Sequence, residues 1–435
     1  MNSAMDTRKQ KEHVVYINWD GFAWYYYELA NKNGSLKTHF INELAKSGVL
    51  FTNAYTGIPS ITNPMQTAIV CGAWPKTTGN CYRYYDRKTN KVIQFGRENK
   101  AETIAEAAVR QGINAASVQQ FILQDRGTKA GDNKNPYIQY EKADYSLRFD
   151  TAIKLIKGEA VGKWGQRIRL RGIPGFLALY MDDLDGIGHN NGTTYGVRQV
   201  KTEEDRVNSV LKRLNEMDEK LEEFVQASKD AGIYDDTSFI LTSDHGMAPY
   251  GQQDLEYDGY GYTKLIDLIK TIESLNYRVD VLDKGQGASH DADIVIVCVG
   301  LEAQLTFARD YSDDEIVRII NAVKDKPYTG AIMTRDEMEK RGAMEGFADL
   351  LISPKPPYSF QPSRRLFIAG GQHDSLDESA QHIFSMMWGK GIKKGYVYTK
   401  KMYNIDFART MAKLLGIDGP KDATGGILEG ALLQR

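Results

Sequence analysis

Three short apolar runs that end in acidic residues constrain the fold of this chain more than any other feature. They are VVYINWD (residues 14–20), FLALYMDDLD (176–185) and TSFILTSDHGM (237–247). Short apolar runs that are rich in β-branched and aromatic residues predict buried strands. In each run the polar residues follow the apolar ones, so we expect them at the carboxyl end of the strand. The three runs therefore predict a sheet with chemically active side chains along one edge.

Helical patterns lie between the predicted strands. Residues 21–47 are compatible with a long helix, residues 101–112 carry apolar side chains at helical spacing before a glycine, and residues 198–231 predict a long charged helix with one apolar face. Strands that alternate with helices predict an α/β fold, with a central, mostly parallel sheet flanked by helices. Ligands of such sheets bind beyond the carboxyl ends of the strands, which is where we expect the acidic residues.

The pattern of predicted helices and strands changes after residue 253. A helix, several short apolar strands, an acidic helix and a Pro-rich stretch (354–362) follow. This pattern predicts a smaller α+β cap over residues 254–360, inserted between two core segments, 11–253 and 361–435. A large domain with an insertion agrees with the length of 435 residues, because one domain has about 150 residues on average.

Composition argues against several classes of protein. With 55 Lys+Arg, 57 Asp+Glu and a formal net charge of -2, the chain lacks the basic surplus of a nucleic-acid-binding protein. Cys71, Cys81 and Cys298 include no Cys-x-x-Cys pair, which argues against a disulfide scaffold and a thiolate zinc site. No apolar run is long enough for a membrane span, and the polar N-terminus predicts neither a signal nor an anchor. A removed signal would leave the same pattern, so compartment and oligomeric state stay open.

Histidines in polar loops are candidate metal ligands when carboxylates lie beside them. Asp185 and His189 are four residues apart in DDLDGIGH, and this spacing brings both side chains to one face of a helical turn. Asp244 and His245 are adjacent, so both can reach one site only if the strand has ended before them. Gly246 indicates that it has.

Two further residues complete the candidate set. Asp20 ends the first predicted strand, and His373 follows the two glycines of GGQH, where the chain returns to the core. Together the aspartates and histidines offer enough oxygen and nitrogen ligands for two ions. Ligands of this kind without thiolates suit zinc or manganese better than calcium.

Thr62 is the candidate nucleophile, in the segment IPSITNPMQTAIVCG. Asn63 and Gln66 form a capping-box pattern over a helix that has Pro64 near its first turn and closes at Gly72. A hydroxyl at a helix N-terminus faces free amide donors and the positive end of the helix dipole, where a phosphoryl oxygen is favoured. The alternative is that Asn63 caps the helix and that Thr62 merely lies at the turn.

The order and spacing of these motifs resemble the alkaline phosphatase superfamily, and within it the nucleotide pyrophosphatase/phosphodiesterase branch. The resemblance rests on VVYINWDGF, on the segment from LAKSGVLF to CYRYYD around Thr62, and on DLDGIGH, TSDHGM and GGQH in that order. It covers most of the chain outside 254–360. It implies an alkaline-phosphatase-like fold and a two-zinc phosphodiesterase or nucleotide pyrophosphatase. The implied substrate is a small phosphate ester, such as a nucleotide, and the implied intermediate is a phosphothreonine.

The resemblance also implies how the ligands divide between two zinc ions, with manganese as the alternative metal. One ion would be held by Asp20, Asp244, His245 and Thr62, and the other by Asp185, His189 and His373.

Three residues are candidates for contacting the substrate. Asn80 matches the amide that contacts a phosphoryl oxygen in the family, but the local spacing is shorter here, so Tyr82 is the alternative occupant of that place. Trp24 and Tyr82 are candidates for stacking on a base or an aryl leaving group. Packing in the core is the alternative role of both aromatic side chains.

The sequence also departs from this branch of the superfamily. After the nucleophile the chain has Asn63-Pro64-Met65-Gln66 where family phosphodiesterases have Phe-Pro-Asn-His, and Thr-Asn-Pro is closer to phosphonoacetate hydrolase. That relative grips its substrate with lysines after the next strand, whereas SVQQFILQDRGTK here has none before Lys129. Cys71 is not followed by Pro-x-Arg at sulfatase spacing, which excludes that branch. Hydrolysis of a phosphonate or a phosphomonoester is the second hypothesis, and a degenerate binding protein is the third.

Overall fold

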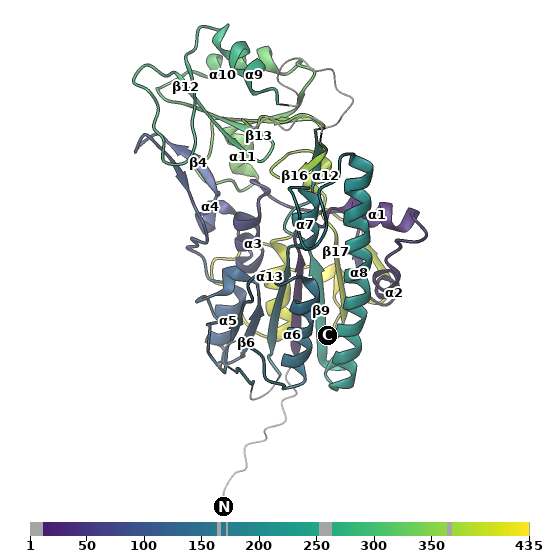
Figure 1. The fold of residues 1–435 in the computed structure, drawn as a ribbon. Helices are drawn as coiled ribbons and strands as arrows, with labels where there is room; N and C mark the ends of the chain where they lie inside the picture. The colour runs from purple at the N-terminus through teal and green to yellow at the C-terminus, as the bar shows by residue number, and fades with distance from the viewer. Residues whose placement is uncertain (1–11, 163–166, 171–172, 252–262, 363–367, 435) are drawn as a thin grey trace, which may run out of the picture.

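The computed structural model describes residues 12–162, 167–170, 173–251, 263–362 and 368–434 (Figure 1). Within these residues the largest sheet has eight strands in the order β18-β2-β17-β9-β1-β8-β6-β7. Neighbouring strands run parallel except at β17, which is antiparallel to both of its neighbours. The strands are β1 (His13–Trp19), β2 (Val49–Phe51), β6 (Ala115–Val118), β7 (Tyr137–Ile138), β8 (Phe176–Met181), β9 (Thr237–Thr242), β17 (Ser385–Gly389) and β18 (Tyr396–Tyr398).

Helices cover both faces of this sheet, and each face has its own apolar core. Side chains of the first group of helices pack with one face, and those of the second group pack with the other. The predicted α/β fold with a mostly parallel, helix-flanked sheet is confirmed. The first group is α1 (Trp24–Lys32), α2 (His39–Ser47), α6 (Tyr145–Ile156) and α8 (Glu203–Asp230); the second is α3 (Thr62–Cys71), α5 (Ile104–Arg110) and α13 (Asp406–Leu415).

The single long helix predicted over residues 21–47 is wrong, because α1 and α2 are separate helices. Helix α1 ends at Lys32, because its C-cap residue Asn33 has an extended backbone. The start of α2 is fixed from outside the segment, since the backbone N–H groups of Phe40 and Ile41 donate to the buried Asp218 carboxylate of α8, at 2.9 and 2.7 Å. Because Asp218 belongs to a distant helix, the sequence of residues 21–47 carries no local signal for the start of α2.

A second, five-stranded sheet lies above the carboxyl edge of the main sheet in Figure 1. Helices α9 and α10 pack on one of its faces. This second unit, residues 265–354, is called the cap below; residues 254–262 of the predicted insertion lie outside the described residues. Its elements are α9 (Leu265–Glu273), β11 (Val279–Val281), β12 (Ile294–Val299), β13 (Glu302–Phe307), α10 (Asp313–Val323), β14 (Thr329–Thr334), α11 (Arg335–Lys340) and β15 (Leu350–Pro354).

A hairpin from the predicted core segment lies on the cap. Its strands are β4 (Arg83–Asp86) and β5 (Lys91–Gln94), and β4 packs against β12. Arg87 at the tip pairs with the buried carboxylate of Asp349 at 3.3 Å. The cap therefore contacts the chain soon after α3, although the two segments are far apart in sequence.

The chain returns from the cap through β16 (Gly370–Gln372), which pairs with β10 (Ala248–Tyr250). It then enters the main sheet as β17, between β9 and β2. The GGQH segment thus lies beside the end of β9, where the sequence places Asp244 and His245. Among the described residues, no helix combines the length and the apolar character that a membrane span requires.

Trp388 of β17 packs this strand against the core. It is fully buried, and its ring stacks on Phe239 of β9 with centroids 5.1 Å apart. We expect Trp388→Ala to lower the free energy of unfolding by about 3–5 kcal/mol, because it leaves a large cavity. The control Val317→Ala, at a side chain of α10 that is 51% exposed, should change it by less than about 0.5 kcal/mol. Chemical denaturation measures both; equal losses would contradict this role of Trp388.

Candidate active site

The strands of the main sheet bring their acidic ends together. Asp20 follows β1, and Asp244 and His245 follow β9, which has ended at Thr242 as predicted. All three side chains at this edge are buried. Gly21 allows the close approach of helix α7 (Asp183–Gly188), since its φ is +72° and a Cβ there would lie 3.0 Å from the Cα of Asp185.

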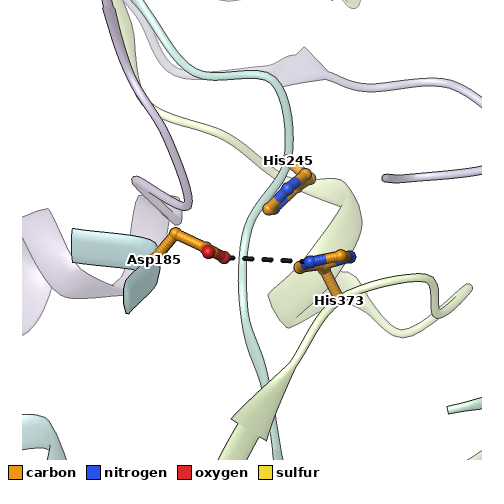
Figure 2. Close-up of side chains that lie close together, drawn as sticks. All are labelled: Asp185, His245 and His373. Carbon is orange, nitrogen blue, oxygen red and sulfur yellow. Dashed lines mark ion pairs between the residues drawn. The ribbon is translucent and has the colours of Figure 1, made fainter. Parts of the chain in front are cut away.

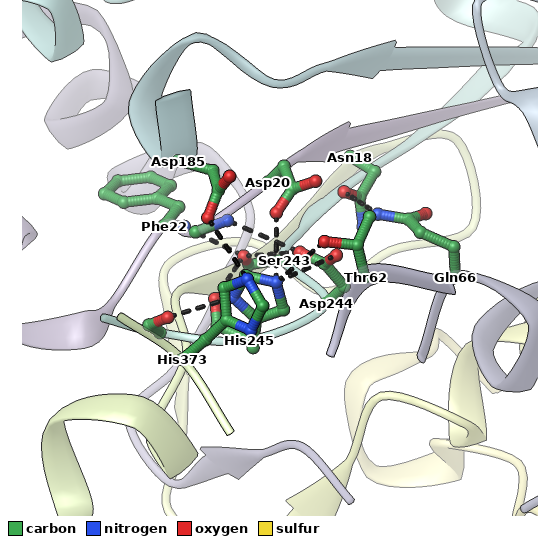
Figure 3. A network of polar contacts seen from close by, with 12 residues as sticks. Asn18, Asp20, Phe22, Thr62, Gln66, Asp185, Ser243, Asp244, His245 and His373 are labelled. Atoms are coloured by element: carbon green, nitrogen blue, oxygen red, sulfur yellow. Dashed lines mark hydrogen bonds and ion pairs between the residues drawn. The ribbon is translucent and has the colours of Figure 1, made fainter. Parts of the chain in front are cut away.

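The first group of candidate ligands surrounds the imidazole of His245 (Figure 3). Its Nε2 lies 3.2 Å from a carboxylate oxygen of Asp20 and 3.5 Å from one of Asp244. Thr62 Oγ1 lies 3.1 Å from the same nitrogen. One ligand atom from each of Asp20, Asp244 and His245 falls within 4.8 Å of the others. The structure thus brings the predicted nucleophile to the predicted ligands.

The second group forms around Asp185, in α7 (Asp183–Gly188). Its carboxylate lies 3.2 Å from Nε2 of His189 and 3.9 Å from Nε2 of His373. Asp185, His245 and His373 point toward one another, and their ligand atoms fall within 4.8 Å (Figure 2). His189 orients its ring through Nδ1, which lies 2.9 Å from the carbonyl oxygen of Gly371. His245 therefore belongs to both groups, which the expected division did not include.

The predicted capping box is wrong. Helix α3 begins at Thr62, with Ile61 as its N-cap and no side-chain cap, so Asn63 lies inside the first turn. Gln66 is buried and donates to the side-chain oxygen of Asn18 in β1 at 2.7 Å. Gln66 therefore makes a hydrogen bond in the interior instead of capping the helix. This bond joins α3, which begins at Thr62, to the strand that precedes Asp20.

Buried polar atoms that lack hydrogen bonds test whether this site suits a metal. Within the described residues, Asp20 Oδ1, Asp185 Oδ1, Asp244 Oδ2 and His373 Nδ1 are buried without a hydrogen-bond partner. Leaving charged oxygens unpaired in the interior is costly, and coordination by a cation removes that cost. Carboxylate and imidazole donors match zinc or manganese. The residues present therefore fit a metal centre.

The pKa values agree with this conclusion. Burial, and then the charge of Asp244, raise the pKa of Asp20 well above its ordinary value. Burial would also raise the pKa of Asp185, but the charge and hydrogen bond of His189 outweigh it and the pKa is lowered. Burial is the main cause that lowers the pKa of His373, which favours the neutral imidazole that a metal requires.

Comparisons with known proteins identify the family. The model of the type I phosphodiesterase / nucleotide pyrophosphatase family matches residues 14–365. The chain belongs to this family. It is 25% identical over 246 residues to an ectonucleotide pyrophosphatase/phosphodiesterase of Caenorhabditis elegans, covering 54% of this chain and 26% of that protein. It is 24% identical over 270 residues to a bis(5'-adenosyl)-triphosphatase of Mus musculus, covering 61% of this chain and 52% of that protein. The chain thus spans only part of the curated relatives it matches.

Solved structures confirm the alkaline-phosphatase-like fold of this type I phosphodiesterase / nucleotide pyrophosphatase family member. Murine ectonucleotide pyrophosphatase/phosphodiesterase 5 has a TM-score of 0.62 at 16% identity, covering 94% of this chain and 96% of that one. The alkaline phosphatase PafA has a TM-score of 0.61 at 15% identity, covering 99% and 100%. The predicted resemblance to the alkaline phosphatase superfamily, in its nucleotide pyrophosphatase/phosphodiesterase branch, is confirmed.

Tyr180 is a site residue of this family member that the sequence analysis missed. It lies in β8 opposite Asn18 of β1, and its hydroxyl donates to the carboxylate of Asp20. Phe121 packs edge-on against its ring, with centroids 5.3 Å apart. A single tyrosine in an apolar strand has no local signal of such a role, because only the pairing of β8 with β1 directs it to Asp20.

We expect Tyr180→Phe to weaken metal affinity about 10–100-fold, because hydrogen bonds to metal ligands orient them. A competition titration against a chromophoric chelator measures this. The control is Tyr85→Phe, which removes a hydroxyl that donates to Asn90 in the hairpin, 2.8 Å away. Equal affinities of both variants would contradict the role of Tyr180.

Arg206 is the second missed residue. The sequence predicts a long charged helix with one apolar face over residues 198–231, but Arg206 in that helix is fully buried. It donates to Tyr26 Oη at 2.9 Å and to the carbonyl oxygen of Gly188 at 3.0 Å, and it pairs with Glu203. Arg206 thus fixes the backbone next to His189.

The three residues predicted to contact the substrate also bond or pack with other residues of the protein. Asn80 is buried, and its amide donates to the carbonyl oxygens of Gly96 and Glu98 at 2.9 and 3.0 Å. Its oxygen accepts the backbone N–H of Tyr82 at 3.1 Å, and the Tyr82 ring packs with residues of β12. These contacts hold Asn80 and Tyr82 in the loop, and their contact with a substrate stays a prediction.

Trp24 stacks on two other rings. Its centroid lies 5.2 Å from that of His382 and 6.2 Å from that of Phe384, both close to parallel. This packing agrees with the alternative that Trp24 is a core residue.

Proposed function

We propose that this chain hydrolyses phosphate diesters of small molecules, with nucleotides as the substrate class, and that Thr62 is the nucleophile. The observation that carries the proposal is the position of Thr62 Oγ1, 3.1 Å from Nε2 of the histidine shared by both Asp/His groups. The family and the names of the relatives support the substrate class. So does the murine relative whose inactive threonine-to-alanine variant was solved in complex with AMP.

The proposed metal ligands follow the two groups. Asp20, Asp244, His245 and Thr62 would hold one zinc ion, and Asp185, His189 and His373 would hold the other, with manganese as the alternative. When bound, the ions would lower the pKa of the threonine hydroxyl and neutralise charge on the leaving oxygen.

The chain's own residues then carry out a double displacement. Thr62 Oγ1 gives up its proton to solvent and attacks phosphorus, the bond from phosphorus to the leaving oxygen breaks, and a phosphothreonine forms. A water molecule then loses a proton and attacks phosphorus, the bond to Oγ1 breaks, and Oγ1 takes up a proton, which restores the hydroxyl of Thr62. The N-terminus of α3, where Thr62 lies, favours the negative charge of the phosphoryl oxygens throughout.

The cap and the compartment are part of the same proposal. The cap, residues 265–354, would select the leaving group, because it lies above the edge that carries Thr62. The relatives are named as ectonucleotide enzymes, which supports action outside the cytoplasm.

A parallel assay of three substrates tests the proposal. The protein is dialysed against a chelator, zinc is added back, and bis-p-nitrophenyl phosphate, p-nitrophenyl phosphate and phosphonoacetate are compared. We expect zinc to restore activity with a preference for the diester. Release of phosphate from phosphonoacetate would instead favour the second hypothesis, which the Thr62-Asn63-Pro64 sequence suggests. No turnover of any substrate by zinc-loaded protein would contradict the proposal.

A further inference from the structure

The turn between β12 and β13 of the cap lies directly against the segment that carries His373. Gly300 in this turn has a φ of +56°, and a Cβ there would lie 2.3 Å from the carbonyl oxygen of His373 and 2.4 Å from the Cβ of Asp374. The backbone N–H of Leu301 donates to the carbonyl oxygen of Asp374 at 3.2 Å. Only glycine permits this approach of the two backbones.

The same segment is bonded to the loop that precedes the nucleophile. The backbone N–H of Asp374 donates to the carbonyl oxygen of Ser60 at 3.0 Å, and that of Ser375 donates to Ser60 Oγ at 3.2 Å. Ser60 is two residues before Thr62, and the intervening Ile61 packs with valines of β12. The cap turn, a candidate ligand and the nucleophile loop thus form one continuous set of contacts.

A buried pair of carboxyl groups joins the cap to this segment. Glu302, the first residue of β13, is 1% exposed, and Asp374 is 0% exposed. The two groups lie side by side, with Ser353 of β15 next to Glu302. Within the described residues, Glu302 Oε1 and both side-chain oxygens of Asp374 are buried without a hydrogen-bond partner.

We propose that the cap turn, residues 299–302, sets the position of His373 and of the loop before Thr62, with Gly300 and Glu302 as its positioning residues. This inference rests on the proposed function, since it assigns the cap a role at that same metal site. The cap then does more than select substrates, because the second ligand group depends on it. The contacts of Gly300 act on the backbone of His373, and Glu302 acts through the neighbouring side chain of Asp374.

A matched pair of glycine variants tests the backbone contact. Gly300→Ala introduces a Cβ that collides with the segment, whereas Gly346→Ala places one at a φ of +76° with nothing within 4 Å. Both variants carry the strain of a left-handed alanine, and both lie in the cap. We expect Gly300→Ala to weaken zinc affinity about tenfold or more, and to lower kcat for bis-p-nitrophenyl phosphate with little change in KM. Gly346→Ala should leave zinc affinity and kcat at wild-type values.

A second series tests the carboxyl pair without altering the backbone. Glu302→Ala leaves Asp374 buried without its neighbour, whereas Glu302→Gln keeps a group of the same size that can hydrogen-bond. We expect the alanine variant to lose zinc affinity about tenfold and the glutamine variant to recover it. Gln304→Ala is the control, because Gln304 is 1% exposed and lies two residues further along the same face of β13. It opens a cavity of similar size and should keep wild-type affinity.

The outcomes separate this inference from the function on which it rests. Equal zinc affinity and kcat in Gly300→Ala and Gly346→Ala, with Glu302→Ala like the wild type, would overturn the positioning role and leave the proposed function intact. Wild-type protein that binds no zinc and cleaves no diester would overturn both. Loss in Glu302→Ala with recovery in Glu302→Gln supports the positioning role even if Gly300→Ala fails to fold.

Discussion

Thr62→Ala is expected to abolish most hydrolysis while the protein stays folded and loaded with metal. The variant keeps the aspartate and histidine ligands of both groups, and it removes the protein atom that the proposed mechanism bonds to phosphorus. We expect kcat for bis-p-nitrophenyl phosphate to fall roughly 10³-fold or more, as it does when an enzymatic nucleophile is deleted. Steady-state kinetics measure the loss, and metal analysis of the same sample shows that the site is retained.

Two comparisons make this result specific. Thr62→Ser keeps a hydroxyl at the start of α3 and should retain measurable turnover. Thr67→Ala removes a buried threonine further along the same helix, whose hydroxyl donates to the carbonyl oxygen of Asn63, and it should leave kcat near the wild-type value. Rapid quenching of the wild-type reaction should yield phosphate on the peptide that contains Thr62. Full activity of Thr62→Ala would show that water attacks directly and would refute the phosphothreonine.

His245→Ala is expected to have the largest effect on metal content. Its imidazole is the one side chain shared by both Asp/His groups within the described residues. Losing it removes a donor from each group and leaves the carboxylates of Asp20 and Asp244 facing each other without compensation. We therefore expect nearly complete loss of bound zinc and of activity, measured by elemental analysis after gel filtration.

Other histidines provide the comparison for His245→Ala. His189 lies against Asp185 of the second group, so His189→Ala should lose one ion and keep the other. His382 stacks between Trp24 and Tyr55, so His382→Ala should keep wild-type zinc content. Equal zinc content in the His245 and His382 variants would contradict the shared ligand. A result in which His189→Ala loses both ions would show that the two groups do not bind independently.

Much of the site could be predicted because its residues lie at strand ends. A buried strand followed by a carboxylate has a local signal, and the parallel sheet brings such ends to one edge. That reasoning placed Asp20, Asp244 and His245 together, and the helical spacing of Asp185 and His189 placed those two on one face. In the structure these residues are in contact.

What could not be predicted depends on contacts between distant segments. Tyr180 bonds to Asp20 because β8 lies next to β1, and Gln66 bonds to Asn18 because α3 packs over the same strand. Neither residue differs locally from an ordinary strand tyrosine or a helix-cap glutamine. Gly300 is one of forty glycines in the sequence. Its close approach to the backbone of His373 can be recognised only in the folded structure.

The order in which the ligands occur along the chain has a consequence for biosynthesis. Asp185 and His189 are synthesised before the cap, whereas His373 is synthesised only after it, and β17 enters the middle of the sheet later still. A growing chain therefore cannot close the second ligand group until the cap has been synthesised. Once bound, an ion there would link α7 to the segment that follows the cap. Because the intervening chain is long, this link would remove far more freedom from the unfolded chain than a local site could.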